Sequence, residues 1–134
     1  MPTNDNRVLG SGKPIAKIQF DQVSWLTGVG HAAKTTLKNN INMLVERVDV
    51  LISAVTANPT VAITFANENS VTVIDGTNFA ALADGTNHTL LSTKATADFD
   101  AVPLNGNITC TVDPSADAGG SAQTLTVDII FYGP

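Results

Sequence analysis

The sequence predicts a mainly β protein with one long N-terminal helix, organised as a small antiparallel β-sandwich or barrel preceded by an extended arm. Three observations support this prediction. Residues 1–14 contain two prolines and two glycines among polar side chains. Between about 32 and 57, apolar residues recur every three or four positions, as on one face of a helix. From Thr60 onwards they alternate with small or polar residues, which is the period of a β-strand.

The arm is predicted to be extended because its prolines and glycines oppose both helix and sheet. Its only adjacent aliphatic pair is Val8 and Leu9. We expect the arm to be disordered in the free protein and to become ordered on a partner. The chain is accordingly divided into the arm, residues 1–14, a strand-and-helix segment, residues 15–59, and a β-domain, residues 60–134.

A short strand is predicted directly after the arm. Ile18 and Phe20 alternate there with polar residues, and Val23, Trp25 and Leu26 then supply large apolar side chains. Trp25, the only tryptophan, is interpreted as a core residue, with an interface anchor as the alternative.

The helix is predicted from six apolar residues spaced alternately four and three positions apart. These are Leu37, Ile41, Leu44, Val48, Leu51 and Val55. In a coiled coil they would occupy a and d positions, in a pattern that favours association of two helices. Met43 and Val50 lie outside this stripe and suggest a second buried face. A helix lying on its own sheet and a helix shared at the symmetry axis of an oligomer are both open, and Asn58-Pro59 ends either one.

Two hairpins are predicted in the β-domain. Residues 61–65 and 71–73 alternate on either side of the turn Asn67-Glu68-Asn69. Residues 108–112 and 125–131 alternate on either side of a loop that contains Pro114 and several small residues. The second hairpin should be apolar on one face and threonine-covered on the other.

The residues that could carry chemistry are few. Asp-Gly-Thr-Asn occurs at 75–78 and again at 84–87, which predicts two turns, with calcium binding as the functional alternative. His31 and His88, the only histidines, lack metal-ligand spacing. Cys110, the only cysteine, lies on the apolar side of its strand, where burial should raise the pKa of its thiol and leave it unreactive. We therefore predict no cofactor, no metal site and no enzymatic activity.

Composition argues against nucleic-acid and membrane partners. The net charge is −5, and the seven Lys and Arg residues are scattered, so no basic patch could neutralise a run of phosphates. No stretch approaches the roughly 18 apolar residues of a membrane span. Charged residues make up only 14% of the chain, so Thr, Asn, Ser and Gly must cover much of its surface. Such a surface fits burial against protein, or an ordinary hydroxyl-covered β-domain.

The polar arm, the apolar helix and the Thr- and Asn-rich β-domain ending in TLTVDIIFYGP at 124–134 together resemble small virion proteins of tailed bacteriophages, in particular head decoration or cement proteins. The resemblance covers the organisation of the whole chain and contains no diagnostic motif. It implies a non-enzymatic structural protein on the capsid exterior, made in the bacterial host cytoplasm, that binds the major capsid protein lattice. It also implies a homotrimer, whereas the apolar pattern of the predicted helix favours a two-stranded coiled coil.

This resemblance assigns two sets of contact residues. The oligomer interface is expected at the six residues of the predicted helix. Lattice contacts are expected in the arm and the first strand, at Val8, Leu9, Ile15, Ile18, Phe20 and Trp25. The alternatives are a phage tail, collar or fibre component, and a carbohydrate-binding β-sandwich used for adhesion. The last usually displays exposed aromatic residues, and this chain has a single tyrosine.

Overall fold

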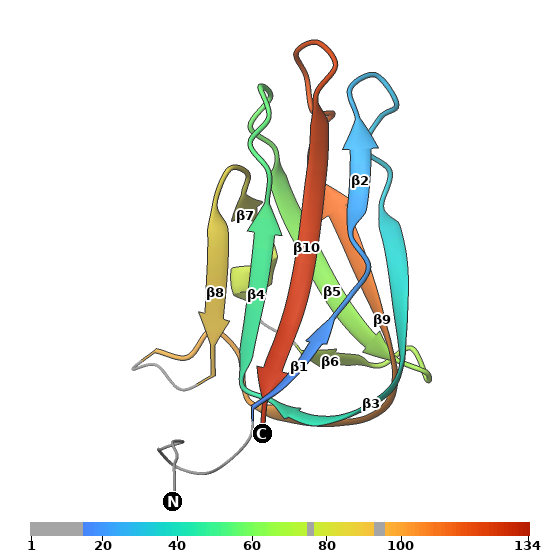
Figure 1. Ribbon diagram of the computed structural model, residues 1–134, viewed down its shortest axis with the longest axis vertical. Coiled ribbons are helices and arrows are strands. Elements are labelled where there is room, and N and C mark those ends of the chain that lie inside the picture. Colours follow the sequence, from blue (N-terminus) through green and yellow to red (C-terminus); the bar gives the residue numbers. More distant parts are fainter. Residues whose placement is uncertain (1–14, 75–76, 93–95) are drawn as a thin grey trace, which may run out of the picture.

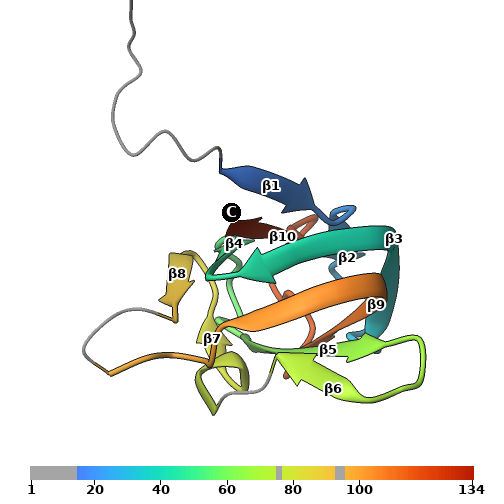
Figure 2. The same cartoon turned by 90° about the horizontal axis from the view of Figure 1, so that it is seen from below.

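The structure is a computed structural model that describes residues 15–74, 77–92 and 96–134. In this part of the chain it contains ten β-strands and one 3-10 turn, with no α-helix. The strands form two five-stranded antiparallel sheets that lie face to face and curl around one core (Figure 1, Figure 2). The predicted arm lies outside the described residues.

The first sheet, sheet A, is built around the last strand of the chain. Its strands are β1 (Ala16–Gln19), β2 (Val23–Leu26), β4 (Arg47–Ile52), β8 (Asn87–Leu91) and β10 (Thr124–Gly133). β10 pairs with β1 and β2 along one edge and with β4 along the other, and β4 pairs with β8. The first and last strands of the described chain are therefore neighbours (Figure 1).

The second sheet, sheet B, is built around β9. Its strands are β3 (Lys34–Val45), β5 (Thr60–Asn67), β6 (Thr72–Ile74), β7 (Leu82–Ala83) and β9 (Val102–Pro114), with the 3-10 turn η2 (Thr77–Phe79) between β6 and β7. β9 pairs with β3 and with β5, and β6 and β7 both pair with the far side of β5. β3 curves from sheet B towards β4 of sheet A (Figure 2).

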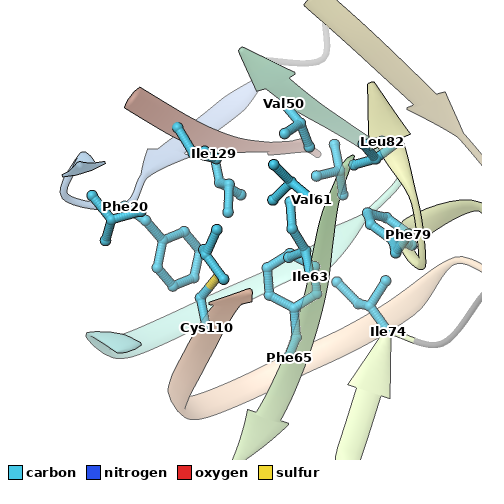
Figure 3. Packing of buried hydrophobic residues seen from close by; sticks show 14 of the residues in the cluster. Phe20, Val50, Val61, Ile63, Phe65, Ile74, Phe79, Leu82, Cys110 and Ile129 are labelled. Atoms are coloured by element: carbon cyan, nitrogen blue, oxygen red, sulfur yellow. The ribbon is translucent and has the colours of Figure 1, made fainter. Parts of the chain in front are cut away.

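All five phenylalanines lie in one cluster between the sheets. Figure 3 shows Phe20, Phe65 and Phe79 among the buried side chains. The ring of Phe131 on β10 has its centroid 5.0 Å from that of Phe20 and 5.0 Å from that of Phe65 on β5. Phe65 contacts Phe79 at 5.7 Å, and Phe79 contacts Phe99 at 6.0 Å. These rings join both sheets and η2 into one core, and tilted or edge-on packing of this kind adds to the hydrophobic gain.

The predicted long helix is wrong, because its residues form β3 and β4, two strands in different sheets. The inward side chains are Ile41, Met43 and Val45 on β3, then Val48, Val50 and Ile52 on β4. Each set has the period of two that a strand requires. Glu46, between the strands, shifts the phase by one residue.

The helical pattern in the sequence mixes the two faces of these strands. Ile41 and Val48 point inward, whereas Leu37, Leu44 and Leu51 occupy the alternating outward positions. A helix would leave Met43 and Val50 off its apolar stripe, yet they are 5% and 0% exposed. The burial of these two residues indicates two strands rather than a helix.

Of the two predicted hairpins, the first is confirmed and the second is wrong. β5 and β6 pair around a turn in which Asn67 Oδ1 accepts hydrogen bonds from the N–H groups of Asn69 at 2.9 Å and Val71 at 3.1 Å. Residues 108–112 and 125–131 are strands as predicted, but β9 and β10 belong to different sheets. The connection between them therefore crosses from one sheet to the other.

Candidate functional site

The outer face of sheet B carries small, mostly uncharged side chains, and we call it the threonine face. It consists of Thr35 and Leu37 on β3, Thr109, Thr111 and Asp113 on β9, and Thr60, Ala62, Thr64 and Ala66 on β5. The residues between them on β5 and β9 point into the core. Asp113 is the single ionisable side chain of this set.

Leu37 is the one large apolar side chain of the threonine face and is 56% exposed. It lies directly opposite Thr109, which in turn lies opposite Ala66. These short side chains cannot cover a leucine. Because few charges would lose water on contact, the face can be desolvated at low cost, which suits it to bind a protein surface.

A second organised region lies where the loops meet at the upper end of the molecule in Figure 1. Asp117, in the β9–β10 loop, accepts hydrogen bonds from the N–H groups of Gly119 at 2.9 Å, Gly28 at 3.0 Å and Gly30 at 3.1 Å. These bonds, that of Gly119 foremost, lower the pKa of Asp117 below its ordinary value of 3.8. Gly28 and Gly30 have φ values of 89° and 88°, which other residues rarely adopt.

Two further loops are tied to this region. Gln123 Oε1 accepts a hydrogen bond from Thr56 N–H at 2.7 Å, and Ala57 N–H donates to the Ala118 carbonyl at 3.0 Å. Asp84 Oδ2 accepts from Val55 N–H at 2.8 Å. We call these joined loops, residues 27–33, 53–59, 84–86 and 115–123, the loop end. Its hydrogen bonds join these four loops to one another.

The predicted turn at 84–87 is present, with Gly85 at a φ of 68°. The carboxylate of Asp84 serves the backbone of the neighbouring loop. The other Asp-Gly step, at 75–76, lies outside the described residues. Within the described ranges, no group of three or more His, Cys, Asp or Glu could hold a metal ion.

The other residues considered for chemistry have structural contacts. Cys110 is buried, and burial raises the pKa of its thiol to about 12, as the sequence predicted. His31 Nδ1 lies 3.0 Å from the Pro114 carbonyl, and His88 Nε2 lies 2.9 Å from the Ala83 carbonyl. No helix among residues 15–74, 77–92 and 96–134 has the length and apolar character needed to cross a membrane.

An open groove of about 560 Å³ lies between the η2–β7 segment and β8. Its polar lining includes Asn78, Asn87, His88 and Asp98. Asp98 also accepts a hydrogen bond from Leu91 N–H at 2.9 Å, so its carboxylate holds the chain in place. No Phe, Tyr or Trp is among the described residues that line the groove, so it offers no ring for stacking against a sugar.

The six residues predicted at an oligomer interface do not share one surface. Ile41, Val48 and Val55 lie in the chain's own core, at 1%, 0% and 6% exposed. Leu37 is exposed on the threonine face, whereas Leu51 is half-buried on the outer face of sheet A. The predicted geometry of this interface, with one helix at a symmetry axis, is therefore wrong.

The predicted lattice contacts also separate. Val8 and Leu9 lie outside the described residues. Exposure then falls along the first strands, from 77% at Ile15 to 2% at Phe20 and at Trp25. The interpretation of Trp25 as a core residue is thus confirmed, and Ile15 is the exposed member of the set.

The loop end was not identified from the sequence. The partners of Asp117 are backbone amides, which side-chain patterns do not reveal. The available signal was glycine: Gly28, Gly30, Gly119 and Gly120 all have positive φ in these loops.

No protein-family model matches the chain, and no curated protein is similar to it in sequence. Among solved structures, a chain of the cyanophage Pam1 capsid asymmetric unit aligns over 100% of both chains, with 16% identity and a TM-score of 0.45. A chain from the infectious bursal disease virus Gt strain aligns over 99% of this chain, with 14% identity and a TM-score of 0.43. The SPBc2 prophage-derived protein YomS aligns over 96% of this chain and 100% of its own, with 16% identity and a TM-score of 0.34. This chain spans 40% of the length of the Gt-strain chain.

Proposed function

We propose that this chain is a non-enzymatic virion structural protein that binds the outside of a phage capsid shell as a decoration or cement protein. The observation that supports it most directly is the threonine face, where exposed Leu37 stands among small side chains with a single ionisable group. The Thr- and Asn-rich β-domain, one of the features in which the sequence resembles head decoration proteins, supplies the setting.

On this proposal the protein acts by thermodynamic linkage. A protein that binds only the assembled shell stabilises it by its own binding free energy. We further propose a homotrimer, because several copies joined in one oligomer gain avidity on a repeating lattice. Ile15 and the arm residues Val8 and Leu9 would add contacts to those of the threonine face.

A matched pair of charge insertions tests the threonine face. Thr64 lies on that face and Thr89 lies on the outer face of sheet A, and both are exposed. Thr64→Lys should weaken binding to capsid shells that lack the protein by about tenfold or more, whereas Thr89→Lys should bind like the parent. Bound copies are counted after co-sedimentation.

The outcomes separate the alternatives. Equal binding by the parent and both variants would place the contact elsewhere than on the threonine face. Failure of the parent to bind shells would refute the decoration role, and binding to purified tails instead would support a tail component. Sedimentation equilibrium tests the trimer separately, and a monomer at micromolar concentration would refute it.

A further inference from the structure

We propose that the free edge of β3, formed by the outward backbone groups of Thr35 and Leu37, accepts one extended segment of the partner protein as an added strand. The inference rests on the proposed function for the identity of the partner, a shell protein. It adds the way in which the two chains join, which is β-strand addition.

The β8 edge of sheet A is bonded by the chain itself at its C-terminal end, at Leu91. Asp98 N–H donates to the Leu91 carbonyl at 2.8 Å, and Leu91 N–H donates to Asp98 Oδ2 at 2.9 Å. Both backbone groups of Leu91 that point away from β4 are therefore bonded. Natural sheets use such covers to prevent unwanted pairing at their edges.

The β2 edge of sheet A is also covered. Lys34 Nζ donates to the Ser24 carbonyl, and Val29 N–H donates to the Leu26 carbonyl at 3.1 Å. The Lys34 ammonium group lies 5.2 Å from the centre of the Trp25 ring, which holds this lysine across the edge. A strand arriving at β2 would have to displace these contacts.

The two edges of sheet B differ in length. Beyond β5, the edge is divided between β6 and β7, which have three and two residues. Such short strands offer few unpaired groups. The opposite edge is β3, with 12 residues, and no strand of the described ranges pairs with its outer side between Lys34 and Lys38.

The register determines which groups of β3 are free. Ser115 N–H donates to the Thr60 carbonyl at 2.8 Å. The alternate residues before it on β9, which are Asp113, Thr111 and Thr109, therefore also direct their backbone groups to β5. The remaining residues of β9 face β3, where their partners are Lys34, Thr36 and Lys38.

Thr35 and Leu37 lie between these partners, so their N–H and C=O groups point away from β9. No hydrogen bond to these outward groups comes from the described part of the chain. They form a row of donors and acceptors of the kind to which an added strand binds.

The free edge has defined limits. The pairing of β3 with β9 shifts register between Lys38 and Ile41. Asn40 has a φ of 56°, and its N–H donates to Asn107 Oδ1 at 3.1 Å. A bulge of this kind bends the strand and interrupts regular pairing. The edge therefore accommodates one short segment opposite Lys34 to Lys38.

Charge selects the kind of segment. Lys34 and Lys38 bracket the edge, and neither has an ion pair with a described carboxylate. Two copies of β3 paired antiparallel about Thr36 would place Lys34 of one copy opposite Lys38 of the other, which is unfavourable. A segment of the shell protein with a carboxylate opposite Lys38 would gain instead, since the Lys34 ammonium group already contacts Ser24 and Trp25. Leu37 offers that segment an apolar contact beside the edge.

Hydrogen–deuterium exchange at single residues tests this inference. In the free protein, the amides of Thr35 and Leu37 should exchange rapidly and that of Thr36, paired with Cys110, slowly. On shells, Thr35 and Leu37 should become protected. If they exchange equally fast on bound and free chains, the edge proposal is wrong while the decoration role stands. Absence of any binding to shells would overturn both.

A proline pair gives an independent test. Leu37→Pro removes an outward N–H without breaking the ladder to β9, and Thr89→Pro does the same on β8, where the N–H points away from β4. Leu37→Pro should weaken shell binding by about tenfold or more, and Thr89→Pro should not. A folded Leu37→Pro protein that binds like the parent contradicts the proposal. If that variant does not fold, the exchange measurement decides.

Reversing one charge tests the nature of the segment. Lys38→Glu should weaken shell binding by about tenfold at low ionic strength, and by less as salt is added. Unchanged binding by this variant would refute an acidic segment.

Discussion

Ile130 on sheet A and Leu37 on sheet B are both outward apolar residues, yet their exposed fractions differ greatly. On sheet A, Ile130 points outward from β10 yet is only 7% exposed, between Gln19 on β1 and Asp49 on β4. On sheet B, Leu37 points outward from β3 and is 56% exposed beside Thr109. The difference lies in the neighbouring side chains.

Around β4 and β10, long polar and aromatic side chains cover the outer face of sheet A, whereas Leu26 on β2 remains 50% exposed. Arg47 forms an ion pair with Asp49 at 3.1 Å, and its guanidinium group lies 3.9 Å from the centre of the Tyr132 ring. Gln22 Nε2 donates to Asp128 Oδ2 at 2.8 Å. Side chains of this length spread over apolar neighbours while keeping their polar ends in water. The short side chains of the threonine face cannot do so, and that face is left open to contact.

The largest effect is expected where the two sheets share their core. Phe131→Ala should lower the free energy of unfolding by about 3–5 kcal/mol, because it removes a ring that contacts both Phe20 and Phe65. Urea denaturation measures this change. Leu37→Ala is the control and should stay within about 0.5 kcal/mol of the parent. A similar loss in both variants would show that Leu37 is not an exposed residue in solution.

A second pair of substitutions separates stability from binding. Ile130→Ala should cost about 2 kcal/mol of unfolding free energy, at the low end for a buried isoleucine because flexible side chains form its cover. Its affinity for shells should remain that of the parent. Leu37→Ala should show the reverse, with stability retained and shell binding weakened. If both substitutions affect the same property, the contrast between the two faces is wrong.

The positions of β5, β6, β9 and β10 could be predicted from the sequence because alternation is a local property, whereas β7 and β8 were not predicted. The β5–β6 hairpin was also predictable, since the Asn67 side chain builds its turn within four residues. The partners of β9 and β10 were not. Their alternation shows only that each has one buried face, and the choice between one sheet and two depends on distant strands.

The false helix has a physical cause that the sequence contained. Inward Ile41 and Val48 lie seven positions apart, because two strands of period two are offset by one residue at Glu46. Outward Leu37, Leu44 and Leu51 then complete a spacing near 3.6. Val48 and Val50 are β-branched residues within that segment, and branched side chains favour strands. The exposure of Leu37 then depends on which face of a strand it occupies, which a helical interpretation cannot give.

Cys110 lies beneath the threonine face, between Thr109 and Thr111. Its replacement should have a modest effect on the free energy of unfolding. Cys110→Ala should cost about 1 kcal/mol. Burial raises the pKa of the thiol from 9.0 to about 12, so its contribution to stability is complete below 9.0 and is lost as pH rises towards 12. The variant should lack this part of the alkaline dependence. Rapid reaction of a thiol reagent with the folded protein would show that the threonine face does not seal the core.

The smallest effect is expected at the loop end, which resembles sheet A in bonding its own polar groups. The folded-state pKa of Asp117 is lowered below 3.8, so its carboxylate contributes stability that is present above 3.8 and is lost as pH falls through the folded value. The unfolding free energies of the parent and Asp117→Asn should therefore differ by a constant amount at neutral pH and converge in acid. A carboxyl NMR titration checks the premise directly, since an Asp117 midpoint at or above 3.8 would mean that the three glycine amides do not hold the carboxylate in solution. Shell binding by this variant should match that of the parent, because the loop end is already joined to itself and the threonine face is the surface left open.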